Sequence, residues 1–130
     1  MGTALQAGAE APVKEVTLTR TDLVMYAGAS GDYNPMHHDE VKAKAAGMPS
    51  VFGHGMFSMG FLGGAVTDFV GLDNLQSYSV RFVKQTWPDE TLRTKVVVRS
   101  VEGGVATLDC SLENDKGEVK VQGEATAKVA

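Results

Sequence analysis

Cysteine is almost absent from this chain of 130 residues, since Cys110 is the only one. A disulfide within the chain is therefore excluded, which suits a reducing compartment. Cys110 lies in an alternating apolar segment, so we expect a buried structural thiol rather than a nucleophile. Basic residues are also few, because 12 lysines and arginines against 16 acids give a formal net charge of −4. Without a basic run or face, the sequence argues against a nucleic-acid partner.

A long hydrophobic run is missing as well. The most apolar stretch, residues 56–71, is too short to span a bilayer, is diluted by glycine and contains Asp68. The first twelve residues have neither the basic start nor the apolar core of a signal peptide. Hydrophobic residues at 43% and charged residues at 22% are typical of a folded soluble domain. We therefore expect one domain over residues 1–130, located in the cytoplasm, with no membrane partner.

Two short helices are expected in the first half of the chain. Residues 22–29 form the first, and Thr19 with Asp22 three positions later resembles a capping box at its start. Residues 40–47 form the second, which Asp39 caps. The intervening polar stretch then connects two helices, so it is either a simple turn or a site.

A longer helix is expected after Gly55. The segment is hydrophobic nearly all round, which predicts a helix enclosed on most sides. Gly60, Gly63 and Gly64 each cost such a helix about 1 kcal/mol relative to alanine. We expect these glycines to allow another backbone, a ligand or a tightly packed sheet to approach the helix closely.

Strands account for the rest. The expected strands are residues 13–18, 77–86, 91–101, 105–113 and 118–130, the last with a bulge at Gly123. Alternation with one polar face is typical of an antiparallel sheet covered on one side. The sequence thus predicts an α+β fold in which a curved antiparallel sheet wraps around one long apolar helix.

The stretch SGDYNPMH, residues 30–37, carries the candidate chemistry. Asp32 and His37 stand five positions apart around Asn34-Pro35, a dipeptide that favours a turn. A turn of this kind places a carboxylate and an imidazole around one small volume, where they can take a proton from water and return one. The alternative is that Asp32 only turns the chain and His37 is an ordinary loop histidine. Spacing alone leaves both open.

Two other chemistries fit less well. No HExxH helix or cysteine ligand set supports a metal site, although three histidines and nearby aspartates offer ligands. No G-x-S-x-G motif supports a serine nucleophile, because GASGD and MFSMG each lack one glycine. We therefore predict no metal.

Residues 26–47 resemble the signature of the MaoC-like dehydratases, the family of (R)-specific enoyl-CoA hydratases. The matching positions are Tyr26, Ser30, Gly31, Asp32, Asn34, Pro35, Met36, His37 and Ala43. A second family element, His-Gly-Met at the start of the central helix, is matched by His54, Gly55 and Met56. The resemblance implies a hot-dog fold and the (R)-specific hydration of 2-enoyl thioesters, or the reverse dehydration.

The resemblance also implies roles for individual residues. Asp32 and His37 would activate one water, and the Gly55 N–H would bind the thioester oxygen. Asn34, His54 and Ser58 would support them. Candidates for substrate contact are Met56, Phe57, Met59, Arg81, Lys84 and Arg93. The substrate would carry coenzyme A or an acyl carrier protein, with no separate cofactor, and the chain would form a homodimer or pair with a related hot-dog subunit.

Departures and rival activities complete these expectations. The family commonly has a Pro-x-x-Gly-Asp turn after the first long strand, whereas Pro88-Asp89-Glu90 is shorter and has no glycine. We expect altered geometry in that loop.

The rival functions are a hot-dog acyl-CoA thioesterase and a non-catalytic subunit of a heterodimeric hydroxyacyl-carrier-protein dehydratase.

Overall fold

A computed structural model describes residues 5–129 and confirms the expected order of elements. The elements are β1 (Glu15–Thr17), α1 (Arg20–Ser30), α2 (Glu40–Ala45), α3 (Gly55–Val70), β2 (Leu75–Phe82), β3 (Thr91–Glu102), β4 (Val105–Asn114) and β5 (Val119–Lys128). Short 3-10 helices, Pro35–His37 and Leu72–Asn74, precede α2 and β2. Within this part of the chain, no helix is long and apolar enough to cross a membrane.

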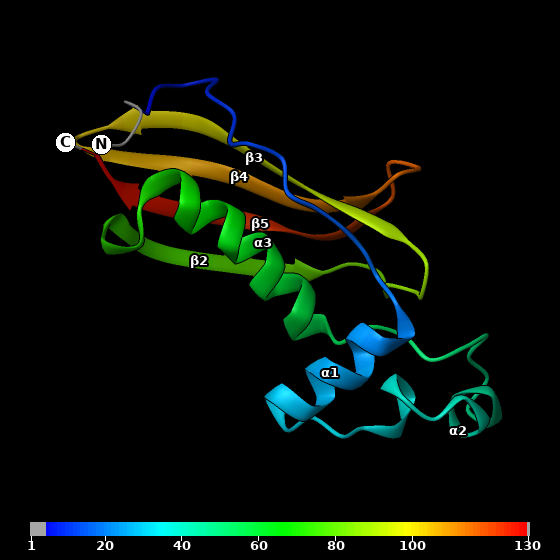
Figure 1. The fold of residues 1–130 in the computed structure, drawn as a ribbon. Coiled ribbons are helices and arrows are strands. Elements are labelled where there is room, and N and C mark those ends of the chain that lie inside the picture. Colours follow the sequence, from blue (N-terminus) through cyan, green and yellow to red (C-terminus); the bar gives the residue numbers. More distant parts are fainter. Residues whose placement is uncertain (1–4, 130) are drawn as a thin grey trace.

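The strands form an antiparallel sheet in the order β1-β3-β4-β5-β2 (Figure 1). The segment before β1 continues along β3, because the N–H of Gly8 donates to the Val98 carbonyl and that of Ala11 to the Val96 carbonyl. The chain therefore covers the β3 edge itself. At the opposite edge, β2 pairs with β5 alone among the described strands.

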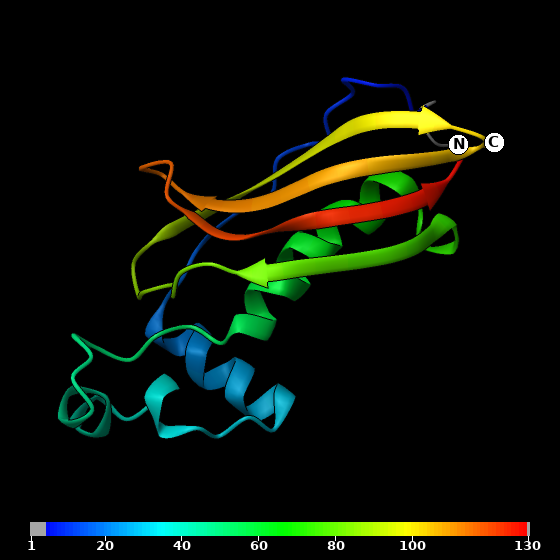
Figure 2. The ribbon, with the colours of Figure 1, turned by 180° about the vertical axis from the view of Figure 1, so that it is seen from behind.

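The helix α3 lies across one face of this sheet (Figures 1 and 2). The main core between them comprises Leu62, Val66 and Val70 of α3 and, from the strands, Leu92, Val96, Val98, Leu108, Leu112, Val121 and Ala125. Each large aliphatic side chain contributes about 1.5–3 kcal/mol by leaving water. Cys110 belongs to the same cluster, and burial raises its pKa to about 12. The prediction of a buried structural thiol is confirmed.

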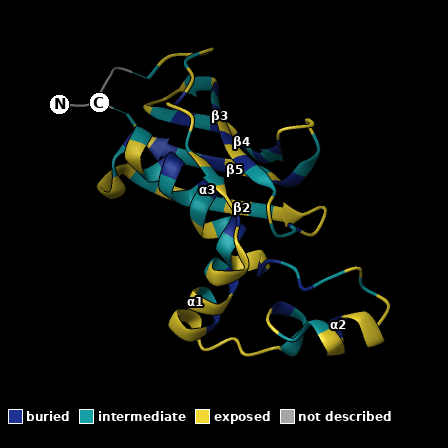
Figure 3. Cartoon of the chain, turned by 45° about the vertical axis from the view of Figure 1, so that its right-hand side comes forward, coloured by how far each residue is buried: buried dark blue, intermediate teal, exposed yellow. Residues whose placement is uncertain are grey.

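The expectation that α3 is enclosed on most sides is wrong for the described chain. Its buried residues are Ser58, Leu62, Ala65, Val66 and Val70, which share the face toward the sheet. Met56, Gly60 and Asp68 are exposed, and Figure 3 shows exposed and half-buried stretches along α3. One sheet covers only one side of a helix, so the remaining apolar surface of α3 lies open.

A second, smaller core lies under α1 and α2, at the end of α3 where the chain enters it. Leu18, Leu23, Ala43 and Val51 are buried there, with Phe57 packed against them. The local signals that define these helices are confirmed. Thr19 and Asp22 form a complete capping box, and Asp39 accepts from the N–H of Lys42. This core therefore holds the loop between α1 and α2 against the first turn of α3.

The predicted bulge at Gly123 is wrong. Gly123 pairs in register with Val80 of β2 and Cys110 of β4. Glycine is needed there because an added Cβ would lie 1.9 Å from the Ser79 carbonyl oxygen. The irregularity of β5 instead falls at Lys120, since Leu112 pairs with Val121 while Glu113 pairs with Val119.

The turn before β3 keeps a closed geometry without its glycine. Asp89 has a φ of 71°, the left-handed conformation that glycine favours and aspartate tolerates. Its N–H donates to the Leu18 carbonyl at 2.6 Å. The Glu90 carboxylate accepts from the N–H of Trp87 at 2.8 Å. These two hydrogen bonds close the turn, and altered geometry relative to the family remains a prediction.

Of the three glycines inside α3, only Gly63 meets a close neighbour. An added Cβ there would lie 3.2 Å from the Tyr78 ring, whereas at Gly60 and Gly64 it would meet nothing within 4 Å. Tight packing on the sheet explains Gly63 and leaves the other two without a steric reason in the described chain.

We expect Gly123→Ala to lower the free energy of unfolding by about 2–3 kcal/mol, because the methyl group would force β2 away from β5. The same change at Gly64 should raise it by about 0.5–1 kcal/mol, since the helix loses an unfavourable glycine without a clash. Urea denaturation of both variants measures the contrast. Equal effects would contradict the described register.

Candidate active site

Short-range hydrogen bonds build the polar loop after α1. The helix ends at Gly31, whose φ of 77° is the left-handed conformation of a helix terminus. The Ser30 hydroxyl accepts from the N–H of Asp32 at 3.1 Å, and the Asp32 carboxylate accepts from the N–H of Asn34 at 3.2 Å. The Asn34 side-chain oxygen accepts from the N–H of Met36 at 3.1 Å and caps the 3-10 helix. Asn34 thus fixes the path from Asp32 to the histidines.

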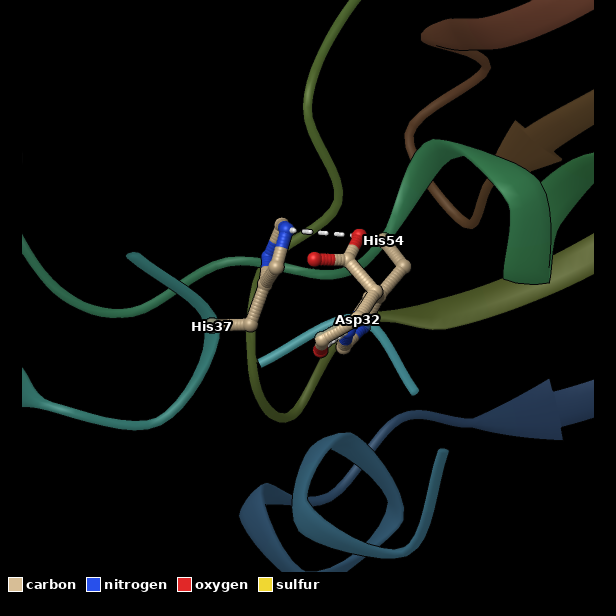
Figure 4. Close-up of side chains that lie close together, drawn as sticks. All are labelled: Asp32, His37 and His54. Atoms are coloured by element: carbon tan, nitrogen blue, oxygen red, sulfur yellow. Dashed lines mark hydrogen bonds and ion pairs between the residues drawn. The ribbon is translucent and has the colours of Figure 1, made fainter. Parts of the chain in front are cut away.

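This loop brings Asp32 and His37 face to face (Figure 4). Asp32 Oδ2 lies 3.9 Å from His37 Nε2, which is too long for a direct hydrogen bond. A water about 2.8 Å from each atom would make roughly a right angle between them, so the separation matches that of two groups bridged by one water. The Asp32 side chain is 53% exposed and that of His37 only 10%. The pair therefore lies at the boundary between the interior and an open surface.

The structure distinguishes the two adjacent histidines. His37 is buried and faces Asp32, whereas His38 is exposed and its Nε2 donates to the Tyr33 carbonyl at 3.1 Å. The sequence motif singled out His37, and His37 is the one that meets the carboxylate.

A backbone carbonyl determines which ring nitrogen of His37 carries a hydrogen. Nδ1 lies 2.7 Å from the carbonyl oxygen of Phe52. A carbonyl only accepts, so Nδ1 carries the hydrogen, and in the neutral ring Nε2 keeps its lone pair. That lone pair faces Asp32, in the arrangement that a general base requires.

His54 packs directly against the His37 ring. The two imidazoles stack with ring centroids 3.8 Å apart and planes 25° apart, and Tyr26 contacts the His54 ring edge-on. His54 Nε2 donates to the Asp32 carbonyl at 3.1 Å, while its buried Nδ1 has no hydrogen-bond partner among the described residues. Burial lowers the pKa of His54, which stays neutral and holds both Asp32 and His37 in place.

A cavity of about 230 Å³ opens beside His37 at the start of α3. Its lining residues come from the segment before α3, from α3, from the last residue of β2 and the chain after it, and from β5: His37, Phe52, Gly53, Gly55, Ser58, Phe82, Val83, Lys84, Gln85, Thr86 and Val121. Gly55 is the first residue of α3, and its N–H has no partner in the described chain. A free N–H at a helix start carries positive potential toward the cavity.

The other candidates for substrate contact lie elsewhere. Met56 is exposed, Phe57 packs in the smaller core, and the Met59 carbonyl accepts from the Tyr78 hydroxyl. Arg81 lines a larger hollow of about 900 Å³ on the outer face of the sheet, away from His37. Arg93 pairs with Glu15 on that same outer side. Of the expected basic contacts, only Lys84 lines the cavity.

Asp32, His37 and His54 each offer a ligand atom within 4.8 Å of the others, which is close enough to consider a metal ion. The stacking opposes that use, because the lone pairs of two nearly parallel rings run side by side instead of converging. The absence of a metal remains a prediction.

Three residues near the site escaped the sequence analysis. Phe52 acts through its carbonyl, which no residue type reveals. Thr86 is buried against Gly53, and its hydroxyl has no hydrogen-bond partner among residues 5–129. Lys120 is fully buried, although alternation in β5 would place it on the solvent side.

Comparison with known proteins places this chain in a family. Residues 5–119 match the family described as MaoC like domain. The chain belongs to this family. The MaoC-like domain has a TM-score of 0.85 against the ChsH1–ChsH2 complex of Mycobacterium tuberculosis, at 25% identity over 95% of this chain and 98% of that one. The predicted hot-dog fold is confirmed.

Two curated relatives of the MaoC-like domain are named as a dehydratase and a hydratase. The 3-hydroxyacyl-thioester dehydratase Y of Mycobacterium tuberculosis is 34% identical over 103 residues, which are 76% of this chain and 35% of the relative. The peroxisomal enoyl-CoA hydratase 2 of Arabidopsis thaliana is 39% identical over 70 residues, 52% of this chain and 23% of the relative. The chain thus spans only a minor part of either relative.

The lowered pKa of His54 predicts a pH-dependent stability. The unfolded chain protonates this histidine near its ordinary value of 6.5, and the folded chain does so only at lower pH. The contribution of His54 to the free energy of unfolding is therefore complete above pH 6.5. Below that pH it falls by up to about 1.4 kcal/mol per pH unit. Urea unfolding of wild type and His54→Gln at pH 7.5, 6.5 and 5.5 should show the two converging as pH falls. Parallel profiles would contradict the effect.

Proposed function

We propose that this MaoC-like domain catalyses the (R)-specific hydration of trans-2-enoyl thioesters to (R)-3-hydroxyacyl thioesters, and the reverse dehydration. The observation that carries this proposal is the Asp32–His37 pair, 3.9 Å apart beside a cavity at the start of α3. The names of the two curated relatives support the reaction class. Coenzyme A or an acyl carrier protein is part of the substrate, and no separate cofactor takes part. The cytoplasmic location remains a prediction.

The pair acts on one water in this mechanism. In the hydration direction the water oxygen bonds to the β carbon, and the pair takes one proton from that water. The pair delivers a proton to the α carbon, so the elements of water add across the double bond and the enzyme is unchanged. Asp32 and His37 act together as one pair, and the α proton comes from that pair.

The Gly55 N–H stabilises the negative charge that develops on the thioester oxygen as water attacks the β carbon. A single donor of this kind is worth about 3–4 kcal/mol of barrier. Ser58 lies one turn further along α3 and lines the same cavity. Lys84, also on the cavity wall, is the residue we assign to the phosphates of the carrier. Phe57, Met59 and Arg81 are not among the residues that line this cavity.

A second hot-dog subunit would complete the site. Asp32 is half exposed, and two large apolar side chains beside Gly55, Met56 and Phe82, are 59% and 51% exposed. The outer edge of β2 is open in the described chain and invites pairing with another strand. We propose a homodimer; the similar ChsH1–ChsH2 complex supports a heterodimer as the alternative.

We expect Asp32→Asn and His37→Gln to reduce crotonyl-CoA hydration by about 10²–10⁴-fold, because each removes one proton-transfer group. His38→Gln is the matched control, since it changes the adjacent exposed imidazole, and it should retain near-wild-type turnover. Loss of the enoyl absorbance without release of free thiol distinguishes hydration from thioester hydrolysis. Full activity of Asp32→Asn would rule out the pair.

Assembly is tested separately. Size-exclusion chromatography with light scattering should give twice the 13.8 kDa chain mass, with hydration activity across that peak. Met56→Glu should shift the protein toward monomer by placing a charge in the apolar contact. A wild-type chain that is monomeric and fully active would contradict the proposed second subunit.

A further inference from the structure

We propose that Lys120 is a positioning residue for His37, acting through the segment that closes the cavity. This role rests on the proposed hydratase site, because His37 is the group being positioned. Lys120 touches neither His37 nor the cavity, and its influence travels through backbone hydrogen bonds.

Lys120 is buried where a lysine is unusual. The register shift between β4 and β5 turns it inward, so Lys120 and Val121 are both buried although they are consecutive in β5. Its Nζ meets three acceptors: the Gln85 carbonyl at 2.9 Å, Glu118 Oε1 at 2.6 Å and Glu90 Oε2 at 3.0 Å. The first two contacts are hydrogen bonds, and the third is an ion pair. A well-packed apolar residue often gives a folded protein as much stability as a buried ion pair does. The charged side chain of Lys120 therefore points to a role in positioning its neighbours rather than in stability.

Lys120 also holds residues 83–86, which form one wall of the cavity. The Lys120 carbonyl accepts from the N–H of Val83 at 2.8 Å and from that of Lys84 at 3.2 Å. With the Gln85 carbonyl on its ammonium, Lys120 binds three successive residues of this segment. Val83, Lys84, Gln85 and Thr86 all line the cavity. Their position is therefore set from behind, by one buried side chain and its own backbone.

The wall in turn orients the acceptor of His37. The N–H of Gly53 donates to the Thr86 carbonyl at 2.8 Å. The other end of that same peptide group is the Phe52 carbonyl, which accepts from His37 Nδ1 at 2.7 Å. An added Cβ at Gly53 would lie 2.1 Å from Thr86 Oγ1, so the two segments are already in close contact. Movement of Thr86 thus rotates the peptide group that selects the tautomer of His37.

The decisive variant is Lys120→Met, which keeps the length of the side chain and removes its donors. Long-range ¹H–¹⁵N spectra of the wild type should show His37 as the single Nδ1–H tautomer, and the variant should show a mixture. Its kcat for crotonyl-CoA should fall about 10- to 100-fold, with little change in KM. Lys120→Arg should recover the single tautomer, because it restores a charged donor to the Gln85 carbonyl.

Two controls separate positioning from loss of stability. Val98→Ala creates a cavity in β3 away from the wall and should leave the His37 tautomer unchanged. Lys95→Met makes the same chemical change on the exposed face of β3 and should also leave it unchanged. A folded Lys120→Met with the wild-type tautomer and kcat would overturn the proposal. A mixed tautomer in Val98→Ala would also overturn it.

A measurement on the wild type decides the matter if Lys120→Met does not fold. Amide hydrogen exchange should show Gly53, Val83 and Lys84 opening together at one rate, as a single cooperative unit. Faster, independent exchange of Gly53 would overturn the link between the wall and the Phe52–Gly53 peptide group. Neither the tautomer nor the exchange measurement needs substrate, so failure of the proposed hydration and failure of this role are distinguishable.

Discussion

The hydrogen bond from His37 Nδ1 to the Phe52 carbonyl joins the two halves of the site. One half is the loop after α1, which supplies Asp32; the other is the segment entering α3, which supplies the free N–H of Gly55. Such a bond adds only about 1 kcal/mol to stability. Its larger effect is to place the imidazole proton on the side away from Asp32. Without it, Nε2 would not reliably present a lone pair to a water between the two groups.

The position of this bond in the fold explains why the site is only partly enclosed. The smaller core under α1 and α2 holds the loop, and the main core holds α3 against the sheet. Both cores include residues of α3, the smaller one Phe57 and the main one Leu62, and Figure 3 shows exposed stretches on α1. Asp32 and Met56 therefore remain open in this MaoC-like domain. Closure by another subunit is the simplest way to exclude bulk water from the pair.

Much of this fold followed from local signals in the sequence. Alternation identified β3 and β4, the Thr19–Asp22 capping box began α1, and the motif spacing separated His37 from His38. Alternation failed at Lys120, because a register shift in β5 turns the side chain inward. A backbone partner such as the Phe52 carbonyl carries no residue-type signal. Arg81 was expected near the substrate, but strand order and side-chain direction, which composition does not encode, place it on the outer face.

Isotope transfer from solvent tests the central claim most directly. The enzyme is incubated with crotonyl-CoA in H₂¹⁸O, and the products are analysed by mass spectrometry with chiral separation. The account predicts one ¹⁸O in the β-hydroxyl of an intact (R)-3-hydroxybutyryl thioester, because the water held by Asp32 and His37 adds to the β carbon. Appearance of ¹⁸O in the carboxylate of a free acid, with the double bond intact, would contradict it.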